Sequence, residues 1–266
     1  MNLFLWLHVI IKIREKSMNF TLKVWRQKDA KDTGGFEAYP IADISEGTSF
    51  LEMLDILNER LVREGHPLGP IAFDHDCREG ICGACSLYID GRTHGPDREI
   101  TTCQLYMRHF KNGATITVEP WRSRVFPVIK DLVVDRQALD SVLQAGGFVS
   151  VNTGGVPDAN AIPIPKRDAD ESLDASSCIG CGACVAGCKN SSAMLFVAAR
   201  VSALATLPQG RLERAERAKA MVAKMDELGF GACSDIGTCQ MECPKQVSIA
   251  HISRLNREFL LAKLRD

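Results

Sequence analysis

The sequence predicts an α+β protein of two domains, the first built of strands around a helix and the second all-α. Three observations support this prediction. Apolar residues alternate along strand-like segments in the first half of the chain, they recur at helical spacing toward the carboxy terminus, and eleven cysteines fall into three bursts. A length of 266 residues also suits one large or two ordinary domains.

The composition is that of an ordinary globular protein, with 45% hydrophobic and 24% charged residues. These fractions exclude a mainly disordered chain. With 32 basic and 33 acidic residues the formal net charge is −1, so nothing global indicates nucleic acid or an anionic membrane surface as the main partner.

Residues 1–17 are interpreted as an amino-terminal extension. Their apolar run, Leu3–Ile11, is well short of the ~20 residues that a membrane span needs, and the basic residues follow the run instead of preceding it. Secretion is therefore disfavoured. Because Met18 opens a strand-like stretch, the extension is either a mispredicted start or a surface helix that lies against a partner or a membrane.

Residues 18–122 are predicted to form the first domain, which opens with a half-buried strand. Phe20, Leu22 and Val24 share one face of this strand. Residues 37–41 supply its partner across a polar, glycine-containing loop.

A helix is expected over residues 49–64, where five apolar side chains recur at helical spacing: Phe50, Leu51, Leu54, Leu57 and Leu61. Two more strands follow, at residues 86–89 before an Asp90-Gly91 turn and at residues 114–119. Strands around one helix make a small α+β domain.

The first burst of cysteines falls in this domain. Cys77, Cys82 and Cys85 are spaced C-x4-C-x2-C, and Cys103 follows after 17 residues. This is the spacing of plant-type 2Fe-2S ligands. Gly80 and Gly83 permit the tight wrap that aims backbone N–H groups at a cluster's sulfurs. A structural zinc site is the alternative, but its cysteines usually come as paired knuckles.

Residues 123–266 are predicted to form a helical domain that carries two further clusters. Residues 120–127 are a linker candidate, and after Val151 a long irregular connection is expected, containing Gly154, Gly155, Pro157, Pro163 and Pro165. Helices are expected at 193–204, 212–228 and 248–264, with a turn at 208–210. In the last helix Ile249, Ile252, Leu255, Phe259 and Leu260 form the inner stripe, and Arg254, Arg257 and Glu258 face outward.

The remaining cysteines follow the register of two-cluster bacterial ferredoxins. Cys178, Cys181, Cys184 and Cys188 form C-x2-C-x2-C-x3-C, whose fourth cysteine crosses to the other cluster. The second run contains Cys233, Cys239 and Cys243, with Ile236 where a fourth thiolate is expected.

This register assigns Cys178, Cys181, Cys184 and Cys243 to a 4Fe-4S cluster. Cys188, Cys233 and Cys239 then offer three thiolates, which suits a 3Fe-4S cluster. The alternative is one 4Fe-4S cluster beside three idle core cysteines. Since the sequence has no Gly-x-Gly-x-x-Gly fingerprint, no C-x-x-C-H haem motif and no nucleophile–base pair, the chain is predicted to conduct electrons for chemistry that lies in its partners.

From Met18 onward the chain resembles the iron–sulfur subunit of the succinate dehydrogenase/fumarate reductase family of respiratory complex II. The resemblance rests on four segments: Cys77-Arg-Glu-Gly-Ile-Cys-Gly-Ala-Cys85, Phe126-Pro-Val-Ile-Lys-Asp-Leu-Val-Val-Asp135, Cys178-Ile-Gly-Cys-Gly-Ala-Cys184, and Cys233 to Pro244 with Ile236 in place of a cysteine. It implies a β-grasp 2Fe-2S ferredoxin-like domain followed by an all-α bacterial-ferredoxin-like domain.

The resemblance also implies partners and a place in the cell. A flavoprotein subunit with FAD would oxidise succinate in the tricarboxylic acid cycle, and electrons would pass through the 2Fe-2S, 4Fe-4S and 3Fe-4S clusters to quinone. The quinone would bind against a membrane cytochrome b subunit, with this chain peripheral on the cytoplasmic face of the bacterial inner membrane. Cys77, Cys82, Cys85 and Cys103 match the 2Fe-2S ligands, although the gap before Cys103 is longer than is common in the family.

Two departures from the family pattern bear on function. Asp74-His-Asp76 replaces more basic residues, and His75 is interpreted as a solvated loop residue. Lys189 replaces the proline of ubiquinone-reducing members, and residues 190–193 contain no aromatic residue. Quinone-binding residues are therefore not assigned, and a branch with a one-chain dihaem cytochrome and menaquinone is the working hypothesis.

Three alternatives stay open. The same subunit could act in fumarate reduction, since direction depends on the potential of the quinone. A ferredoxin-like subunit of another flavin-dependent oxidoreductase would usually have two complete four-cysteine runs, against which Ile236 argues. A structural iron–sulfur module would show no reversible reduction.

Overall fold

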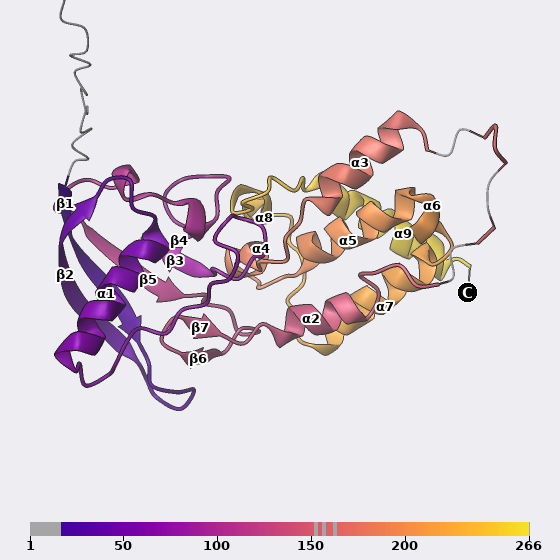
Figure 1. Ribbon diagram of the computed structural model, residues 1–266. Coiled ribbons are helices and arrows are strands. Elements are labelled where there is room, and N and C mark those ends of the chain that lie inside the picture. The colour runs from indigo at the N-terminus through magenta and orange to yellow at the C-terminus, as the bar shows by residue number, and fades with distance from the viewer. Residues whose placement is uncertain (1–16, 152–153, 156–157, 162–163, 266) are drawn as a thin grey trace, which may run out of the picture.

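The structure is a computed structural model that describes residues 17–151, 154–155, 158–161 and 164–265. The molecule is elongated, with a strand-rich half at one end and a helical half at the other (Figure 1). The predicted α+β class and the order of the two halves are confirmed. Apart from Ser17 the predicted extension lies outside the described residues, as do Pro157 and Pro163 of the irregular connection.

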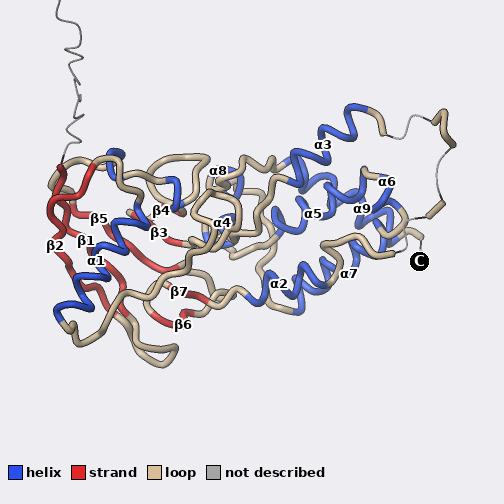
Figure 2. The backbone as a smooth tube through the Cα atoms, viewed as in Figure 1, coloured by secondary structure: helices blue, strands red, loops and turns tan. Residues whose placement is uncertain are grey.

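The strand-rich half holds a five-stranded sheet and one long helix. Its elements are β1 (Ser17–Arg26), β2 (Gly35–Ser45), α1 (Phe50–Glu64), β3 (Leu87–Ile89), β4 (Arg92–Thr93), the 3-10 turns Thr102–Gln104 and Met107–His109, and β5 (Thr115–Pro120). The strand order is β2-β1-β5-β3-β4, with β1 antiparallel to β2 and parallel to β5. Because α1 lies across one face of this sheet (Figure 2), the arrangement is the expected β-grasp.

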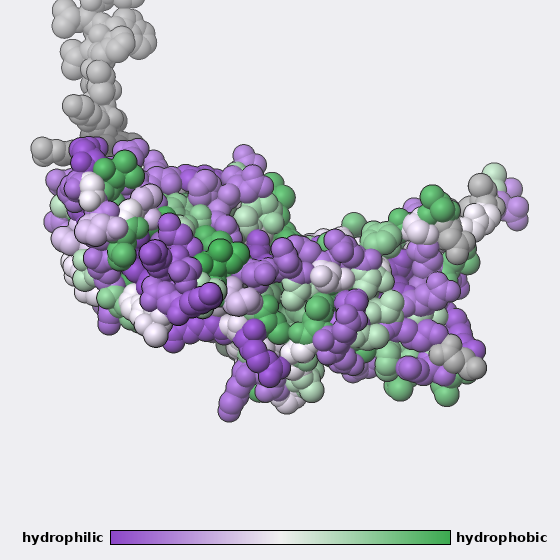
Figure 3. All heavy atoms as spheres, turned by 90° about the horizontal axis from the view of Figure 1, so that it is seen from below, coloured by the Kyte–Doolittle hydropathy of each residue, from purple (hydrophilic) through white to green (hydrophobic). Residues whose placement is uncertain are grey.

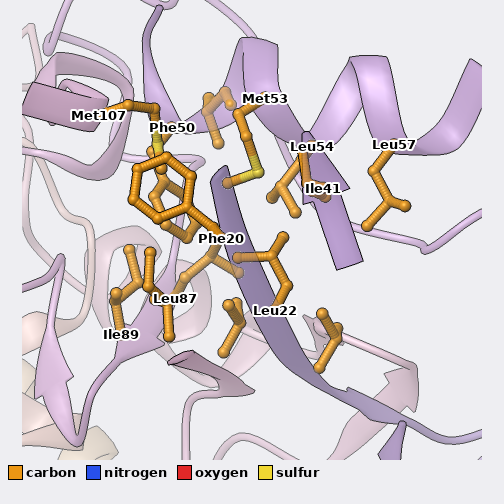
Figure 4. Packing of buried hydrophobic residues seen from close by; sticks show 14 of the residues in the cluster. Phe20, Leu22, Ile41, Phe50, Met53, Leu54, Leu57, Leu87, Ile89 and Met107 are labelled. Atoms are coloured by element: carbon orange, nitrogen blue, oxygen red, sulfur yellow. The ribbon is translucent and has the colours of Figure 1, made fainter. Parts of the chain in front are cut away.

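The core of this half lies between β1 and α1, as the sequence predicts. Phe20, Leu22 and Val24 are at most 3% exposed, and the five predicted apolar residues of α1 are buried in the same cluster. Figure 4 shows Phe50, Leu54 and Leu57 of α1 in this cluster with Phe20 and Leu22 of β1. Ser49 caps α1, since its Oγ accepts the N–H of Glu52 while the Glu52 carboxylate accepts the N–H of Ser49. This reciprocal capping fixes where the helix begins.

The helical half contains a short β-ribbon and eight helices among its described residues. They are β6 (Val128–Lys130), β7 (Val133–Val134), α2 (Gln137–Gln144), α3 (Lys166–Ser176), α4 (Ala183–Ala186), α5 (Met194–Thr206), α6 (Pro208–Arg211), α7 (Arg214–Glu227), α8 (Thr238–Met241) and α9 (Ala250–Lys263). Helix α5 is buried on most sides, as expected for a core helix, and α3, α7 and α9 pack against it. No helix among the described residues is long and apolar enough to span a membrane.

The predicted turn at residues 208–210 is wrong, because this segment is the single-turn helix α6. Pro208 stands at its first position, where a missing N–H costs nothing. Gly210 then packs so closely on α5 that a Cβ there would lie 2.1 Å from the carbonyl oxygen of Leu204.

Two residues of α9 also differ from the prediction. Glu258 is buried instead of outward, because Arg214 and Arg254 supply charged partners for its carboxylate at 3.7 and 3.9 Å. Leu260 is 63% exposed instead of buried. Besides Ile252 and Leu255, the buried residues of α9 are His251, Glu258 and Ala262, so the apolar stripe is narrower than predicted.

The predicted linker at residues 120–127 is a packed connection. Trp121 and Phe126 are each 1% exposed and belong to the core of the helical half. Leu132, further along the chain, packs into the core of the strand-rich half. Residues 121–132 therefore contribute to both cores in turn. The boundary at which the two halves of the molecule contact each other is called the seam below.

Candidate iron–sulfur centres

The first cysteine burst lies on a glycine-containing loop that directs backbone N–H groups at sulfur. Sγ of Cys77 accepts the N–H groups of Glu79, Ile81 and Cys82 at 3.3, 3.4 and 3.3 Å. These hydrogen bonds stabilise the thiolate and lower the pKa of Cys77 to about 7. Gly80 and Gly83 have φ of +75° and +73°, so the predicted need for glycine in the wrap is met.

Cys85 and Cys103 complete this group from the buried side. The 3-10 turn Thr102–Gln104 brings Cys103 beside Cys85, and Thr101 Oγ1 lies 3.2 Å from Cys103 Sγ. A hydrogen bond between the two thiols lowers the pKa of Cys103 and raises that of Cys85. The long gap before Cys103 is thus no obstacle to its joining the first group. His75 is exposed beside the loop, as interpreted from the sequence.

The second group lines a small cavity in the helical half. Four cysteines contribute to its wall: Cys178, Cys181, Cys184 and Cys243. Leu195, Phe196 and Val247 supply apolar wall. Burial raises the pKa of Cys181 to about 12 and raises the pKa of Cys178 and Cys184 as well, because a thiolate in apolar surroundings is poorly solvated. Only the positive charge of a bound metal centre would make these thiolates favourable.

The third group lines a neighbouring small cavity. Cys188, Cys233 and Cys239 contribute thiols, and Ile236 contributes to the same wall. The N–H of Asp235 donates to Cys233 Sγ at 3.4 Å. Within the described ranges, no three cysteine, histidine or carboxylate side chains gather around a single point as ligands of one metal ion do. Thiols spread over the wall of a cavity fit a body of several atoms, such as an iron–sulfur cluster.

Two families of iron–sulfur domains match the chain. The family described as "2Fe-2S iron-sulfur cluster binding domain" matches residues 21–141, and the family described as "4Fe-4S dicluster domain" matches residues 174–247.

Relatives match over nearly the full length. The succinate dehydrogenase iron–sulfur subunit of Bacillus subtilis is 26% identical over 260 residues, which are 95% of this chain and 96% of that protein. The fumarate reductase iron–sulfur subunit of Escherichia coli O6:H1 is 24% identical, over 93% of this chain and 97% of that protein. The chain belongs to the iron–sulfur subunit family of succinate dehydrogenases and fumarate reductases. A solved chain described as "Mycobacterium smegmatis Sdh1 complex in the apo form" has the same fold, with a TM-score of 0.67 at 23% identity, over 92% of this chain and 98% of that one.

Membership of this family confirms an iron–sulfur electron-transfer subunit with 2Fe-2S and 4Fe-4S domains. The assignment of individual cysteines to clusters stays a prediction, although the structure gathers the predicted sets into three groups.

Sequence reasoning missed the residues that join the two halves at the seam. Tyr88 Oη donates to the carbonyl of Ala186 at 2.6 Å, and the backbone N–H of Thr93 donates to the Glu242 carboxylate at 3.1 Å. Ala186 lies on α4, close to Cys184 and Cys188, and Glu242 directly precedes Cys243. The seam contacts therefore hold the loops of this iron–sulfur subunit that carry the second and third groups.

Proposed function

We propose that the chain is the electron-transfer subunit of a succinate:quinone oxidoreductase and holds three clusters in three separate cysteine groups. The observation that carries this proposal is the segregation of the thiols. The cavities of the second and third groups share Leu195 but no cysteine, and the first group lies on a different loop in the other half. The proposed ligands are Cys77, Cys82, Cys85 and Cys103 for 2Fe-2S, Cys178, Cys181, Cys184 and Cys243 for 4Fe-4S, and Cys188, Cys233 and Cys239 for 3Fe-4S.

When bound, the clusters supply one-electron carriers, and the residues of this chain hold them and tune their charge. The N–H groups around Cys77 stabilise negative charge at the first group. The apolar walls of the second cavity keep water from its thiolates. Ile236 occupies the wall of the third cavity with a side chain that cannot ligate iron.

Exposed apolar residues near the first and third groups support docking of two partners. Ile81, next to the exposed Cys82, is 62% exposed, while Ile236 and Met241 near the third group are 56% and 53% exposed. Hydrophobic residues also reach the surface over both halves of the face in Figure 3. We assign the first site to an FAD-containing flavoprotein and the third to a membrane cytochrome b with quinone at the interface, on the cytoplasmic face of the inner membrane.

The vacancy for a fourth thiolate at Ile236 gives the sharpest test of the cluster assignment. In the full complex the oxidised wild type should give the near-isotropic EPR signal of a three-iron centre. Ile236→Cys should abolish that signal and give a 4Fe-4S centre of lower potential, because a fourth thiolate can hold a fourth iron and adds negative charge.

Ile236→Val is the matched control, since it changes the side chain without adding a ligand. It should keep the three-iron signal. A wild type without this signal, or a cysteine variant that retains it, would refute the assignment.

Fumarate reduction is the second candidate for physiological direction, favoured by the likeness to the fumarate reductase subunit of Escherichia coli. Membranes that contain the complex should be assayed for succinate oxidation with quinone and for fumarate reduction with quinol. A faster rate in the succinate-to-quinone direction supports the proposal, and the reverse supports the alternative. Purification without a flavin-bearing subunit would contradict both.

A further inference from the structure

The loops of the first and second groups touch at the seam. Gly83 lies between Cys82 and Cys85 of the first loop, and its backbone packs against the second loop between Cys178 and Cys181. A Cβ on Gly83 would lie 2.6 Å from the carbonyl oxygen of Ile179 and 3.1 Å from the backbone nitrogen of Cys181. Only a glycine allows this approach, so the contact is a short through-backbone path between the two groups.

Arg136 bridges this contact from the start of α2. Its Nη1 donates to the carbonyl of Gly83 at 2.6 Å, to Ser86 Oγ at 3.1 Å and to the carbonyl of Cys181 at 3.1 Å. Ser86 Oγ itself lies 3.3 Å from both carbonyl oxygens. One nitrogen of a half-buried side chain thus joins both cysteine loops.

The charge of Arg136 distinguishes it from the arginines that only stabilise the fold. Arg26 and Arg217 are buried and each pairs with a carboxylate, Asp131 and Glu213 respectively, at 3.1 Å. The three acceptors of Arg136 are neutral oxygens, and it forms no ion pair within the described part of the chain.

The field of Arg136 reaches both sides of the seam. Its charge lies beside the second group, because Nη1 is 3.1 Å from the carbonyl oxygen of Cys181. It also acts to lower the pKa of Asp74, which precedes the first loop, although burial is the larger effect there and raises that pKa. A positive charge so placed favours the more negative, reduced form of any redox centre on either loop.

We propose that Arg136 is a positioning residue for electron transfer between the first and second centres. It holds the two cysteine loops in contact, and its charge raises the reduction potentials of both centres. In the step concerned, one electron leaves the reduced 2Fe-2S centre and enters the oxidised 4Fe-4S centre, and no bond or proton is exchanged. This inference rests on the proposed cluster assignment.

The test is a potentiometric titration of all three centres by low-temperature EPR, in membranes that contain the full complex. Arg136→Met and Arg136→Gln should each lower the potentials of the first and second centres by at least the ~59 mV that corresponds to a tenfold change in a one-electron equilibrium. The third centre should keep its potential, because its ligands do not contact Arg136. Arg136→Lys, which keeps the charge, should restore most of both potentials.

Arg60→Met is the matched control, because Arg60 donates to the carbonyl of Pro40 and touches neither loop. It should change none of the three potentials. Unchanged potentials in Arg136 variants that carry all centres would overturn the inference alone. Loss of the first two centres from both uncharged variants would also overturn it, since Arg136 would then be structural. A wild type without the 2Fe-2S and 4Fe-4S signals would overturn the proposed function as well.

Discussion

The first and second cysteine groups have opposite effects on thiolates, since backbone N–H groups stabilise a thiolate in the first and burial destabilises thiolates in the second. Around Cys77 and Cys82 the sulfurs are near the surface and accept backbone N–H groups, which bring the pKa of Cys77 to about 7. Around Cys181 and Cys184 the walls are apolar, and burial raises the pKa of Cys181 to about 12.

This contrast indicates in which half of the molecule folding is coupled to metal binding. The first loop is prepared for thiolates before a metal arrives. The second cavity lies within the core of the helical half and becomes favourable only when a metal centre neutralises its thiolates. Folding of the helical half should therefore depend on its clusters more strongly than folding of the strand-rich half does.

The largest expected effect comes from removing one proposed ligand from the second group, compared with removing one from the first group. Cys184→Ser should lose the 4Fe-4S signal and leave the helical half open to proteolysis, because an alcohol is a poorer iron ligand and is costly to bury unpaired. Cys82→Ser should weaken or alter only the 2Fe-2S signal. Iron content, EPR and limited proteolysis of the two variants check this.

The comparison would break if both variants gave the same protease resistance. It would reverse if Cys82→Ser, and not Cys184→Ser, exposed the helical half. Either result would mean that the N–H groups around Cys77 do not prepare the first loop as argued.

An intermediate effect is expected at the two glycines of the first loop. Gly80→Ala should cost about 1–2 kcal/mol, the usual penalty for a left-handed residue with a Cβ. Gly83→Ala should cost more, because its Cβ would also collide with the carbonyl of Ile179, whereas at Gly80 the nearest atoms belong to side chains.

The melting temperatures of the two variants measure this difference, since the backbone strain is matched. Equal melting temperatures would mean that the contact at the seam yields without cost. Hydrogen exchange at the amide of Cys181 should rise in Gly83→Ala alone.

The smallest effect concerns an ion pair in each half. Arg254 pairs with Glu171 between α9 and α3, and Arg78 pairs with Asp55 between the first loop and α1. Partly exposed pairs contribute at most about 1 kcal/mol, so Glu171→Gln and Asp55→Asn should each cost no more than that.

The Glu171 pair should also give a pH dependence. The hydrogen bond from Arg254 lowers the pKa of Glu171 below its ordinary value of 4.5. A lowered pKa in the folded state means that the stabilisation is complete above pH 4.5 and is lost as the pH falls through the folded value. Urea titrations from pH 7 downward should show the loss in the wild type and not in Glu171→Gln. The exposed ion pair Lys166–Asp170 is the control, and Asp170→Asn should alter the pH dependence of the free energy of unfolding less than Glu171→Gln does.

Local patterns in the sequence predicted most of the strand-rich half. Phe20, Leu22 and Val24 alternate because one face of β1 is buried, and Ser49 with Glu52 contains the signal for the start of α1. Cysteine spacing indicated Cys77, Cys82 and Cys85, and likewise Cys178, Cys181 and Cys184, for a similar reason, since ligands on one short loop are close in space wherever the loop lies. The more distant members of the three groups, Cys103, Cys188 and Cys243, came from the known ligand registers. The division of the chain between residues 122 and 123 stays a prediction.

Most of the features that the sequence does not predict depend on contacts between distant segments. The sequence predicts Glu258 to be a surface residue, because the partner that accompanies its burial, Arg214, lies on another helix. Helices α2 and α3 were not predicted, because each is short or mostly polar. Arg136 carries no signal in its own neighbourhood, and its role depends on the carbonyls of Gly83 and Cys181, which are 98 residues apart along the chain.

The seam also has a consequence for how the protein is made. The strand-rich core is completed by Leu132, and the buried Arg26 needs the carboxylate of Asp131. Both residues follow Trp121, which belongs to the helical core. On the ribosome, the core of the strand-rich half therefore cannot be completed until the segment that contains Leu132 has left the exit tunnel. By then Trp121 and Phe126 have also left the tunnel, before the later helices against which they pack. Synthesis order and packing order are interleaved, so a pause in translation soon after Leu132 has left the tunnel would leave Trp121 and Phe126 exposed to chaperones.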